Sequence, residues 1–172
     1  MGFVGTCYRA HDPRWSFEPI SGEGAAIRGA RFNSKGVPTL YLALGIMTAV
    51  KEANQGFAHR IDPCVLCAYE VDCSGIIDLR TPKGRDEAGV RFEDMSCAWM
   101  DYLAEGKRPP SWAIHDRFVA EGKSGILVPS FAPGASETDQ NLVLWSWSED
   151  LPRRVKVIDP SGRLPRNQLS WN

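Results

Sequence analysis

The sequence lacks an excess of charge of either sign. Across its 172 residues, 20 Lys and Arg side chains nearly balance 21 Asp and Glu side chains, which gives a net charge of -1. A molecule with this balance has no overall field to attract a phosphate backbone. A general nucleic-acid-binding protein is therefore disfavoured, and we expect the chain itself to bind no nucleic acid.

Long apolar runs are also missing. The longest near the N-terminus, 39–50, contains Gly45 and Thr48 and is shorter than the roughly 20 residues that span a bilayer. The first ten residues lack the basic stretch followed by an apolar one that marks a signal peptide. These absences predict a cytoplasmic protein with no membrane partner.

Cysteine is too sparse and too irregular for a disulfide framework. The five cysteines form an odd set, which suits a reducing compartment. Cys64 and Cys67 make one C-x-x-C pair, but they lie at the start of a strand-like run, where odd spacing points them to opposite faces. No second pair has matching spacing. We therefore expect no metal site and no redox function.

What the chain does have is enough apolar material for one core. It is 43% hydrophobic and contains six Trp, seven Phe and four Tyr, and its length suits one domain of roughly 100 to 200 residues. No internal repeat or linker divides it. The prediction is a single domain over residues 1–172, with Trp99, Trp112, Trp145 and Trp147 in the core.

Strand-like runs outnumber helical ones in the pattern of apolar residues. Seven short strands are predicted, at 6–10, 39–42, 65–72, 75–79, 125–130, 141–147 and 153–159. Helical spacing predicts about three helices, at 45–57, 92–103 and 111–121, and the stretch 11–29 reads as a loop. Since strands and helices do not strictly alternate, the predicted class is α+β with mainly antiparallel sheets. No glycine motif supports a Rossmann fold or a P-loop.

The faces of these helices follow from their spacing. In the first helix Ile46, Val50, Ala53 and Phe57 form an apolar stripe, and Glu52 lies roughly 120° from its centre. In the second helix, the face predicted to be buried consists of Phe92, Met95, Trp99 and either Tyr102 or Leu103. For the third, Ser111 is the expected N-cap and Gly122 the left-handed residue after the last turn.

Three polar residues could meet in one cleft: Arg31 in a loop, Tyr41 on a strand and Glu52 on the following helix. Each also has an ordinary interpretation, because a loop Arg is usually solvated, a strand Tyr is usually core and a helix Glu is usually at the surface. The residues three and four positions from Glu52 are Thr48, Ala49, Gln55 and Gly56. None is basic, so the usual ion pair along the helix is missing.

The order of these residues carries a family resemblance. The run Gly-Ala-Arg-Phe-Asn-Ser-Lys-Gly at 29–36, then Tyr-Leu-Ala at 41–43, then Ala-x-x-Glu at 49–52, resembles the opening signature of RES-domain toxins, named for Arg, Glu and Ser. Ser130 would supply the serine, and Asn141 opens the following strand as in the family. Phe32 stands where many members have Trp. The ends also resemble the family, through Tyr8-Arg9, Arg163-Leu164-Pro165 and Ser170-Trp171.

This resemblance implies an ADP-ribosyltransferase-like fold, NAD as the substrate, and an antitoxin partner with an Xre-like region. It also implies site residues. Glu52, Tyr41 and Arg31 would be catalytic, and Arg9, Arg31, Tyr41, Ser130 and Asn141 would bind NAD. Glu52 would stabilise the positive charge that develops on the ribose, and Arg31 and Arg9 would grip the diphosphate. Tyr41 would stack on the nicotinamide ring.

The expected activity is cleavage of the nicotinamide–ribose bond. The family is divided, because some members destroy NAD and others transfer ADP-ribose to a protein, an enzyme of phosphoribosyl pyrophosphate synthesis. We expect transfer to a protein acceptor, with hydrolysis or phosphorolysis of NAD as the close alternative. Two further alternatives stay open. The chain could be an endoribonuclease toxin that uses its basic C-terminal cluster, or an interaction module without catalysis. Ser130, which follows Pro129, could also be an ordinary turn residue.

Overall fold

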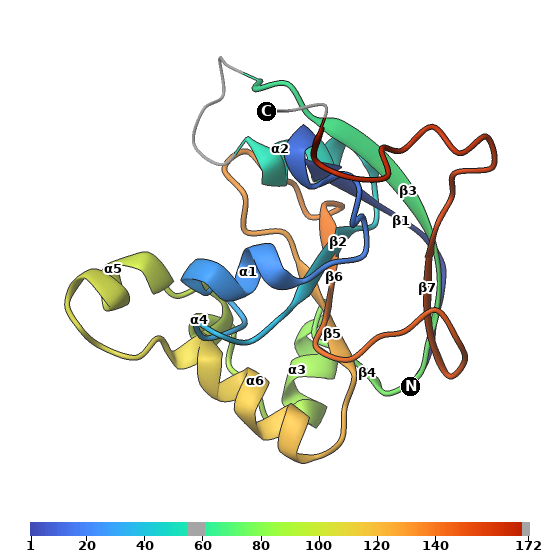
Figure 1. Cartoon of the computed structure of the whole chain (residues 1–172). Helices are drawn as coiled ribbons and strands as arrows, with labels where there is room; N and C mark the ends of the chain where they lie inside the picture. Colours follow the sequence, from blue (N-terminus) through green and yellow to red (C-terminus); the bar gives the residue numbers. More distant parts are fainter. Residues whose placement is uncertain (55–60, 170–172) are drawn as a thin grey trace.

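One mainly antiparallel sheet organises the part of the chain that the computed structural model describes, residues 1–54 and 61–169 (Figure 1). Its strand order is β4-β5-β6-β2-β1-β3-β7, and only the β4–β5 pair is parallel. The strands are β1 Phe3–His11, β2 Leu40–Ala43, β3 Val65–Cys73, β4 Ile76–Asp78, β5 Gly125–Pro129, β6 Gln140–Leu144 and β7 Arg153–Val157. The predicted α+β class is confirmed, and all seven predicted strands are present.

The described residues contain more helices than the sequence predicted. There are six, α1 Glu23–Arg28, α2 Ile46–Ala53, α3 Pro82–Ala88, α4 Phe92–Ser96, α5 Trp99–Ala104 and α6 Pro110–Ala120, and a 3-10 turn at Pro13–Trp15. Helix α1 lies within the predicted loop 11–29, and α3 was not predicted. Four of the six have seven residues or fewer, which is too short for an apolar periodicity to stand out.

The predicted helix at 92–103 is wrong as a single element. The chain leaves the helical conformation at Cys97 and Ala98, so α4 ends at Ser96 and α5 begins at Trp99. Of the face predicted to be buried, only Met95 lies in the core, while Phe92 is 43% exposed. The break turns α5 away from the sheet (Figure 1).

Helix α6 starts differently from the prediction. Pro109 is its N-cap and Pro110 its first residue, a position where proline costs no hydrogen bond. The predicted capping role of Ser111 is wrong, because its hydroxyl instead donates to the carbonyl oxygen of Arg31. The left-handed conformation predicted for Gly122 is confirmed, with φ of 72°.

The sheet is buried on both faces at its centre. In β5 and β6 successive side chains join two different apolar clusters: Leu127, Leu142 and Leu144 belong to one, and Ile126 and Val143 to the other. This alternation is the period of a strand. The first cluster continues along β1, β2, β3 and β7, and the second is covered by α3, α4 and α6. Helix α2 packs against β1 and β2.

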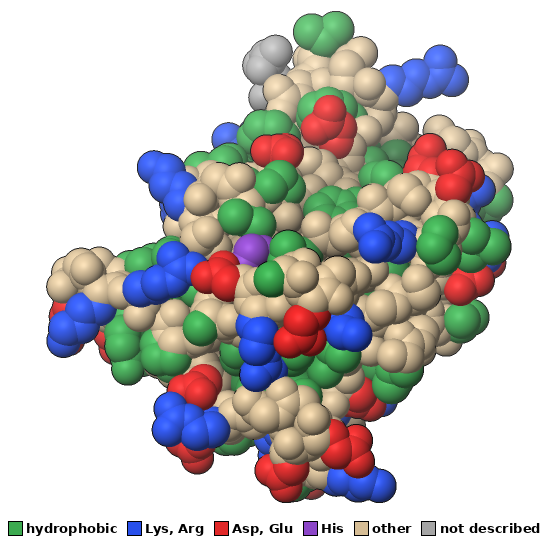
Figure 2. Space-filling model, turned by 90° about the horizontal axis from the view of Figure 1, so that it is seen from below, with side chains coloured by type: hydrophobic (Ala, Val, Ile, Leu, Met, Phe, Trp, Pro, Cys, Tyr) green, Lys and Arg blue, Asp and Glu red, His purple; other side chains and the backbone are tan. Residues whose placement is uncertain are grey.

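Surface features agree with the balanced composition. On the side seen from below in Figure 2, acidic and basic side chains are interspersed without a large patch of one sign. Cys64 is exposed and Cys67 is buried, so this pair points apart as predicted, and all five cysteines are free. None of the helices in residues 1–54 and 61–169 has the length and apolar character to cross a membrane. Gln55, Gly56, Phe57, Ser170 and Trp171, which the sequence analysis named, lie outside the described residues.

Candidate active site

A cavity of about 880 Å³ lies between α1, α2, α5 and the strands β1, β2 and β6. Five of the predicted site residues line it: Arg9, Arg31, Tyr41, Glu52 and Asn141. Ser130 does not line it but contacts Glu52 directly. Residues separated by more than a hundred positions are therefore brought to one hollow, and Arg31 and Glu52 share it.

Helix α2 presents Glu52 on its inner face rather than on a margin. The stripe predicted to be buried is wrong, because Ile46 is 48% exposed and the buried residues are Thr48 and Ala49. Glu52 follows these two at helical spacing of four and three, so it continues the buried face. The hydrogen bonds of Thr48 and Glu52 fix this face toward the sheet, although the apolar stripe alone would favour the opposite orientation.

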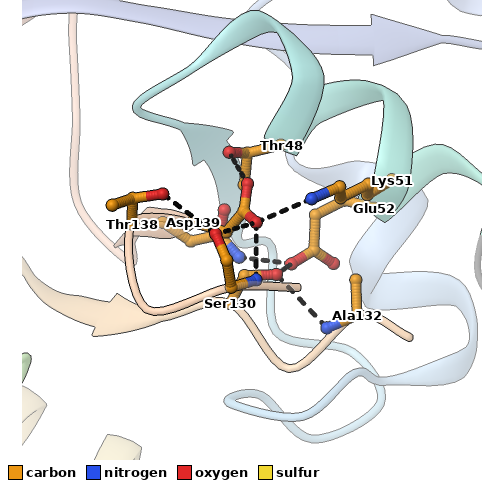
Figure 3. Close-up of polar contacts among 9 residues, drawn as sticks. Thr48, Lys51, Glu52, Ser130, Ala132, Thr138 and Asp139 are labelled. Carbon is orange, nitrogen blue, oxygen red and sulfur yellow. Dashed lines mark hydrogen bonds and ion pairs between the residues drawn. The ribbon is translucent and has the colours of Figure 1, made fainter. Parts of the chain in front are cut away.

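Glu52 is held by two side chains from the other end of the chain. The hydroxyl of Ser130 and the amide Nδ2 of Asn141 both donate to its Oε1 atom, at 2.6 and 2.5 Å. The backbone N–H of Ala132 donates in turn to Ser130 Oγ at 3.2 Å (Figure 3). Hydrogen bonds to a charged acceptor are the stronger kind. The carboxylate therefore has a fixed place at the cavity wall.

A second carboxylate, Asp139, fixes α2 from behind. It is 6% exposed and accepts hydrogen bonds from Thr48 Oγ1 at 2.6 Å and Lys51 Nζ at 2.8 Å, both on α2. Ser136 adds its backbone N–H at 2.7 Å and its hydroxyl at 2.9 Å (Figure 3). The bond from Lys51 and those from Ser136 and Thr48 lower the pKa of Asp139. The network ties α2 to the loop that carries Ser130.

Arg31 is anchored through one of its nitrogens. Nη1 donates to the carbonyl oxygens of Met95 and Cys97, at 3.0 and 2.6 Å, and the guanidinium carbon lies 4.6 Å from the ring centre of Phe131. Burial lowers the pKa of Arg31, although a guanidinium stays charged. Nε and Nη2 donate no hydrogen bond within the described residues, so the edge that grips an oxyanion is left for a ligand.

Arg9, on β1, repeats this arrangement. Its Nη1 donates to the carbonyl oxygen of Ser21 at 2.8 Å and reaches that of Pro19 at 3.5 Å, and burial lowers the pKa of the guanidinium. A third arginine, Arg28 on α1, also lines the cavity and is exposed. It was not predicted, because a charged residue at a helix end looks like any solvated side chain. Among the described residues, the charged lining thus consists of three arginines and Glu52.

Tyr41 has its hydroxyl committed to the fold. The hydroxyl accepts from the backbone N–H of Phe32 at 3.0 Å and donates to Asn33 Oδ1 at 2.8 Å, and burial raises its pKa. Asn33 is fully buried and uses Nδ2 to bond the carbonyls of Ala25, Ser34 and Val37. Tyr41 therefore shapes the loop that carries Arg31, and its ring lines the cavity. Stacking on nicotinamide stays a prediction.

The loop from 30 to 32 is fixed by its own carbonyl groups. Trp112 Nε1 donates to the oxygen of Ala30 at 2.8 Å, and Trp145 Nε1 donates to that of Phe32 at 3.0 Å. Phe32 is 2% exposed and belongs to the second apolar cluster. An aromatic ring at position 32 is thus a core residue that anchors the site.

Metal ligands are not gathered at this cavity. Among residues 1–54 and 61–169 no group of three or more His, Cys, Asp or Glu side chains could hold a metal ion. The chemistry open to the site is that of one carboxylate among guanidinium groups, with amide and hydroxyl donors beside it.

Comparison with known families identifies the class of protein. The family model described as "RES domain" matches residues 6–167, and the chain belongs to this family. The chain is also similar in structure to a chain in the crystal structure of the M.tuberculosis MbcT-MbcA toxin-antitoxin complex, with a TM-score of 0.65 and 22% identity over 92% of this chain and 84% of that chain. That likeness shows a shared fold. No curated protein sequence gives a significant match.

Proposed function

We propose that this chain is the toxin of a bacterial toxin–antitoxin pair that cleaves the nicotinamide–ribose bond of NAD and passes ADP-ribose to a protein acceptor. The observation that carries the proposal is the lining of the cavity, where Glu52 is the one carboxylate of the described residues and lies with Arg9, Arg28 and Arg31. A cavity with this balance suits a ligand that is negative at its phosphates and becomes positive at one sugar.

The reaction needs one acidic group rather than the pair used for ordinary glycosides. Nicotinamide leaves the ribose as a neutral molecule, so no general acid has to protonate it, in contrast to a leaving alcohol. Glu52 would stabilise the oxocarbenium charge as it develops and would bind the ribose 2′-hydroxyl. A preorganised charge is most effective in a partly dehydrated site, and the bonds from Ser130 and Asn141 supply that preorganisation.

Two guanidinium groups are candidates to bind the diphosphate of NAD. Arg9 and Arg31 each hold a protein carbonyl through Nη1 and leave Nε and Nη2 without a hydrogen bond in the described residues. This is the edge that makes two parallel bonds to phosphate oxygens. Lysine cannot reproduce it, so Arg31→Lys should weaken NAD binding although the charge is kept.

An unsatisfied acceptor also supports a bound ligand. Asn141 donates through Nδ2 to Glu52, and its Oδ1 is buried and accepts no hydrogen bond from the part of the chain that the structure describes. Such groups in native proteins usually have an unseen partner. The carboxamide N–H of nicotinamide or a ribose hydroxyl would supply one at this wall.

The antitoxin partner is inferred from similarity to known proteins. Family membership and the likeness to a chain of a toxin–antitoxin complex support a cytoplasmic toxin held by an Xre-like antitoxin. An enzyme that makes phosphoribosyl pyrophosphate is the acceptor to test first. Hydrolysis or phosphorolysis to free ADP-ribose products shares the same bond cleavage and the same Glu52.

The test is expression of the chain and of Glu52→Gln in bacteria, with NAD and protein-bound ADP-ribose measured over time. Removal of one such electrostatic group should slow NAD cleavage by about 100- to 1,000-fold and abolish growth inhibition. Glu87→Gln is the matched control, since Glu87 is exposed on α3 in a long ion pair with Lys83.

Products separate the alternatives. Label from the adenylate half of NAD that stays on protein supports transfer, and label found only in small molecules supports hydrolysis or phosphorolysis. Growth inhibition by Glu52→Gln equal to that of the unmodified chain would refute the proposal and favour an interaction module. Salt-sensitive RNA cleavage without NAD loss would favour an endoribonuclease.

A further inference from the structure

Trp99 differs from the other tryptophans that were expected in the core. The indole N–H groups of Trp112, Trp145 and Trp147 donate to the backbone carbonyls of Ala30, Phe32 and Ile20. The indole of Trp99 makes no hydrogen bond within the described residues. Trp99 is also not buried like Trp112 and is not packed against an apolar cluster like Trp145 and Trp147. It lines the cavity instead. The prediction of a core role for Trp99 is therefore wrong.

Packing of α5 against the core does not explain the aromatic ring of Trp99. No residue of α5 is buried, and Met100, its second residue, is 62% exposed while it also lines the cavity. Figure 1 shows α5 standing out from the body of the molecule. A large apolar ring that is partly exposed at a cavity wall and packs against no core cluster is a usual feature of ligand sites.

Trp99 lies on the Arg31 side of the cavity. The carbonyls that anchor Arg31 belong to Met95 and Cys97, four and two residues before Trp99. The turn that breaks the predicted helix therefore has two effects, since its carbonyls hold the Arg31 guanidinium and α5 then begins with Trp99 at the cavity. One turn of the chain thus both positions the cation from the loop after α1 and supplies the flat ring of Trp99.

We propose that Trp99 is the stacking surface for a flat heteroaromatic ring of the dinucleotide, a specificity-determining residue of the site. This inference rests on the proposed function. Stacking of a base on an aromatic side chain contributes enough that its loss weakens binding by about 5- to 150-fold. Adenine and nicotinamide both have such a face, and the ligand fragments in the test tell them apart.

The test measures binding of ADP-ribose, which lacks nicotinamide, and of nicotinamide mononucleotide, which lacks adenine. Each is titrated into the Glu52→Gln chain by calorimetry and by quenching of tryptophan fluorescence. Trp99→Leu should weaken binding of the fragment whose base stacks, and Trp99→Phe should restore most of that affinity while it removes the quench. Trp15→Phe is the control, because Trp15 is exposed, stacks on Phe17 and does not line the cavity.

Outcomes separate the two proposals. Loss for ADP-ribose alone assigns adenine to Trp99, and loss for nicotinamide mononucleotide alone assigns nicotinamide. If a folded Trp99→Leu chain binds both fragments with unchanged affinity, the stacking role is overturned even if NAD is cleaved. If growth inhibition is lost while that affinity is unchanged, Trp99 contacts a protein instead. Absence of binding by both fragments to the Glu52→Gln chain and to the unmodified chain overturns both proposals.

Discussion

Asp139→Asn should destabilise the protein through the buried network behind α2. The carboxylate accepts from Thr48, Lys51 and twice from Ser136. Asparagine keeps the shape and one oxygen, but its amide nitrogen cannot accept the bonds that ended on the other oxygen. Loss of hydrogen bonds to a charged group costs about 1.5 to 3 kcal/mol each.

Solvent exposure of the hydrogen-bond donors to Asp139 limits the total loss of unfolding free energy. Lys51 has a side chain 33% exposed and Ser136 is exposed, so both can turn to water after the substitution. The cost should therefore stay below the roughly 3 to 5 kcal/mol of an uncompensated buried charge. We expect the free energy of unfolding at about pH 7 to fall by about 2 to 3 kcal/mol.

The effect should depend on pH in a defined direction. The folded pKa of Asp139 is depressed, so its stabilisation is present above the ordinary carboxyl pKa and is lost as pH falls below about 4 towards the folded value. The asparagine variant has no such titration. The difference in unfolding free energy between the two proteins should thus shrink at about pH 3.

Urea unfolding followed by tryptophan fluorescence, at both pH values, measures this difference. Glu87→Gln is again the control, since an exposed pair at that spacing contributes at most about 0.5 kcal/mol. A loss for Asp139→Asn no larger than that of the control, or a loss that does not diminish in acid, would refute the role given to the network.

Three further substitutions test the rest of the site. Tyr41→Phe should cost about 1 to 3 kcal/mol in urea unfolding, because two buried hydrogen-bonding groups lose the hydroxyl. Ser130→Ala should slow NAD cleavage by roughly 10- to 100-fold, since it removes a bond to Glu52; an unchanged rate would contradict its positioning role. Gly125→Ala should cost at least about 1 to 3 kcal/mol, because its Cβ would lie 2.2 Å from the carbonyl oxygen of Val143; a melting temperature equal to that of the unmodified chain would contradict the close strand approach.

The strands could be predicted from the sequence because each alternates over a buried sheet. In β5 and β6 neighbouring residues enter different clusters, so the pattern reports packing directly. Short helices give no such signal. Helix α3 could have been found by capping instead, since Thr81 accepts from the N–H of Gly84, Pro82 opens the helix and Gly89 ends it in a left-handed turn.

The orientation of α2 could not be predicted from its own residues. Its apolar stripe through Ile46 faces outward, and the inner face carries Thr48 and Glu52, whose partners lie 91 and 78 positions away, at Asp139 and Ser130. Periodicity measures only the local preference for burial. A polar pairing between distant segments is invisible to it until the fold brings them together.

The candidate residues Arg31, Tyr41 and Glu52 were found through family kinship, whereas Arg28 and Trp99 were not. Both look ordinary in the sequence, one as a charged residue at a helix end and one as an aromatic at helical spacing. Only the cavity distinguishes them, because lining it depends on the turn after α4 and on the path of α1.

The place of β2 in the sheet bears on when the candidate site is complete during synthesis of the chain. This strand, with the helix that follows it, pairs on one side with β6, which the ribosome makes about a hundred residues later. Until that segment has emerged from the ribosome, the nascent chain lacks Asn141, and Glu52 lacks this hydrogen-bond donor. A chain cut short before β6 would therefore lack one wall of the cavity, and the whole segment between α2 and β6 must be translated before Glu52 can meet Asn141.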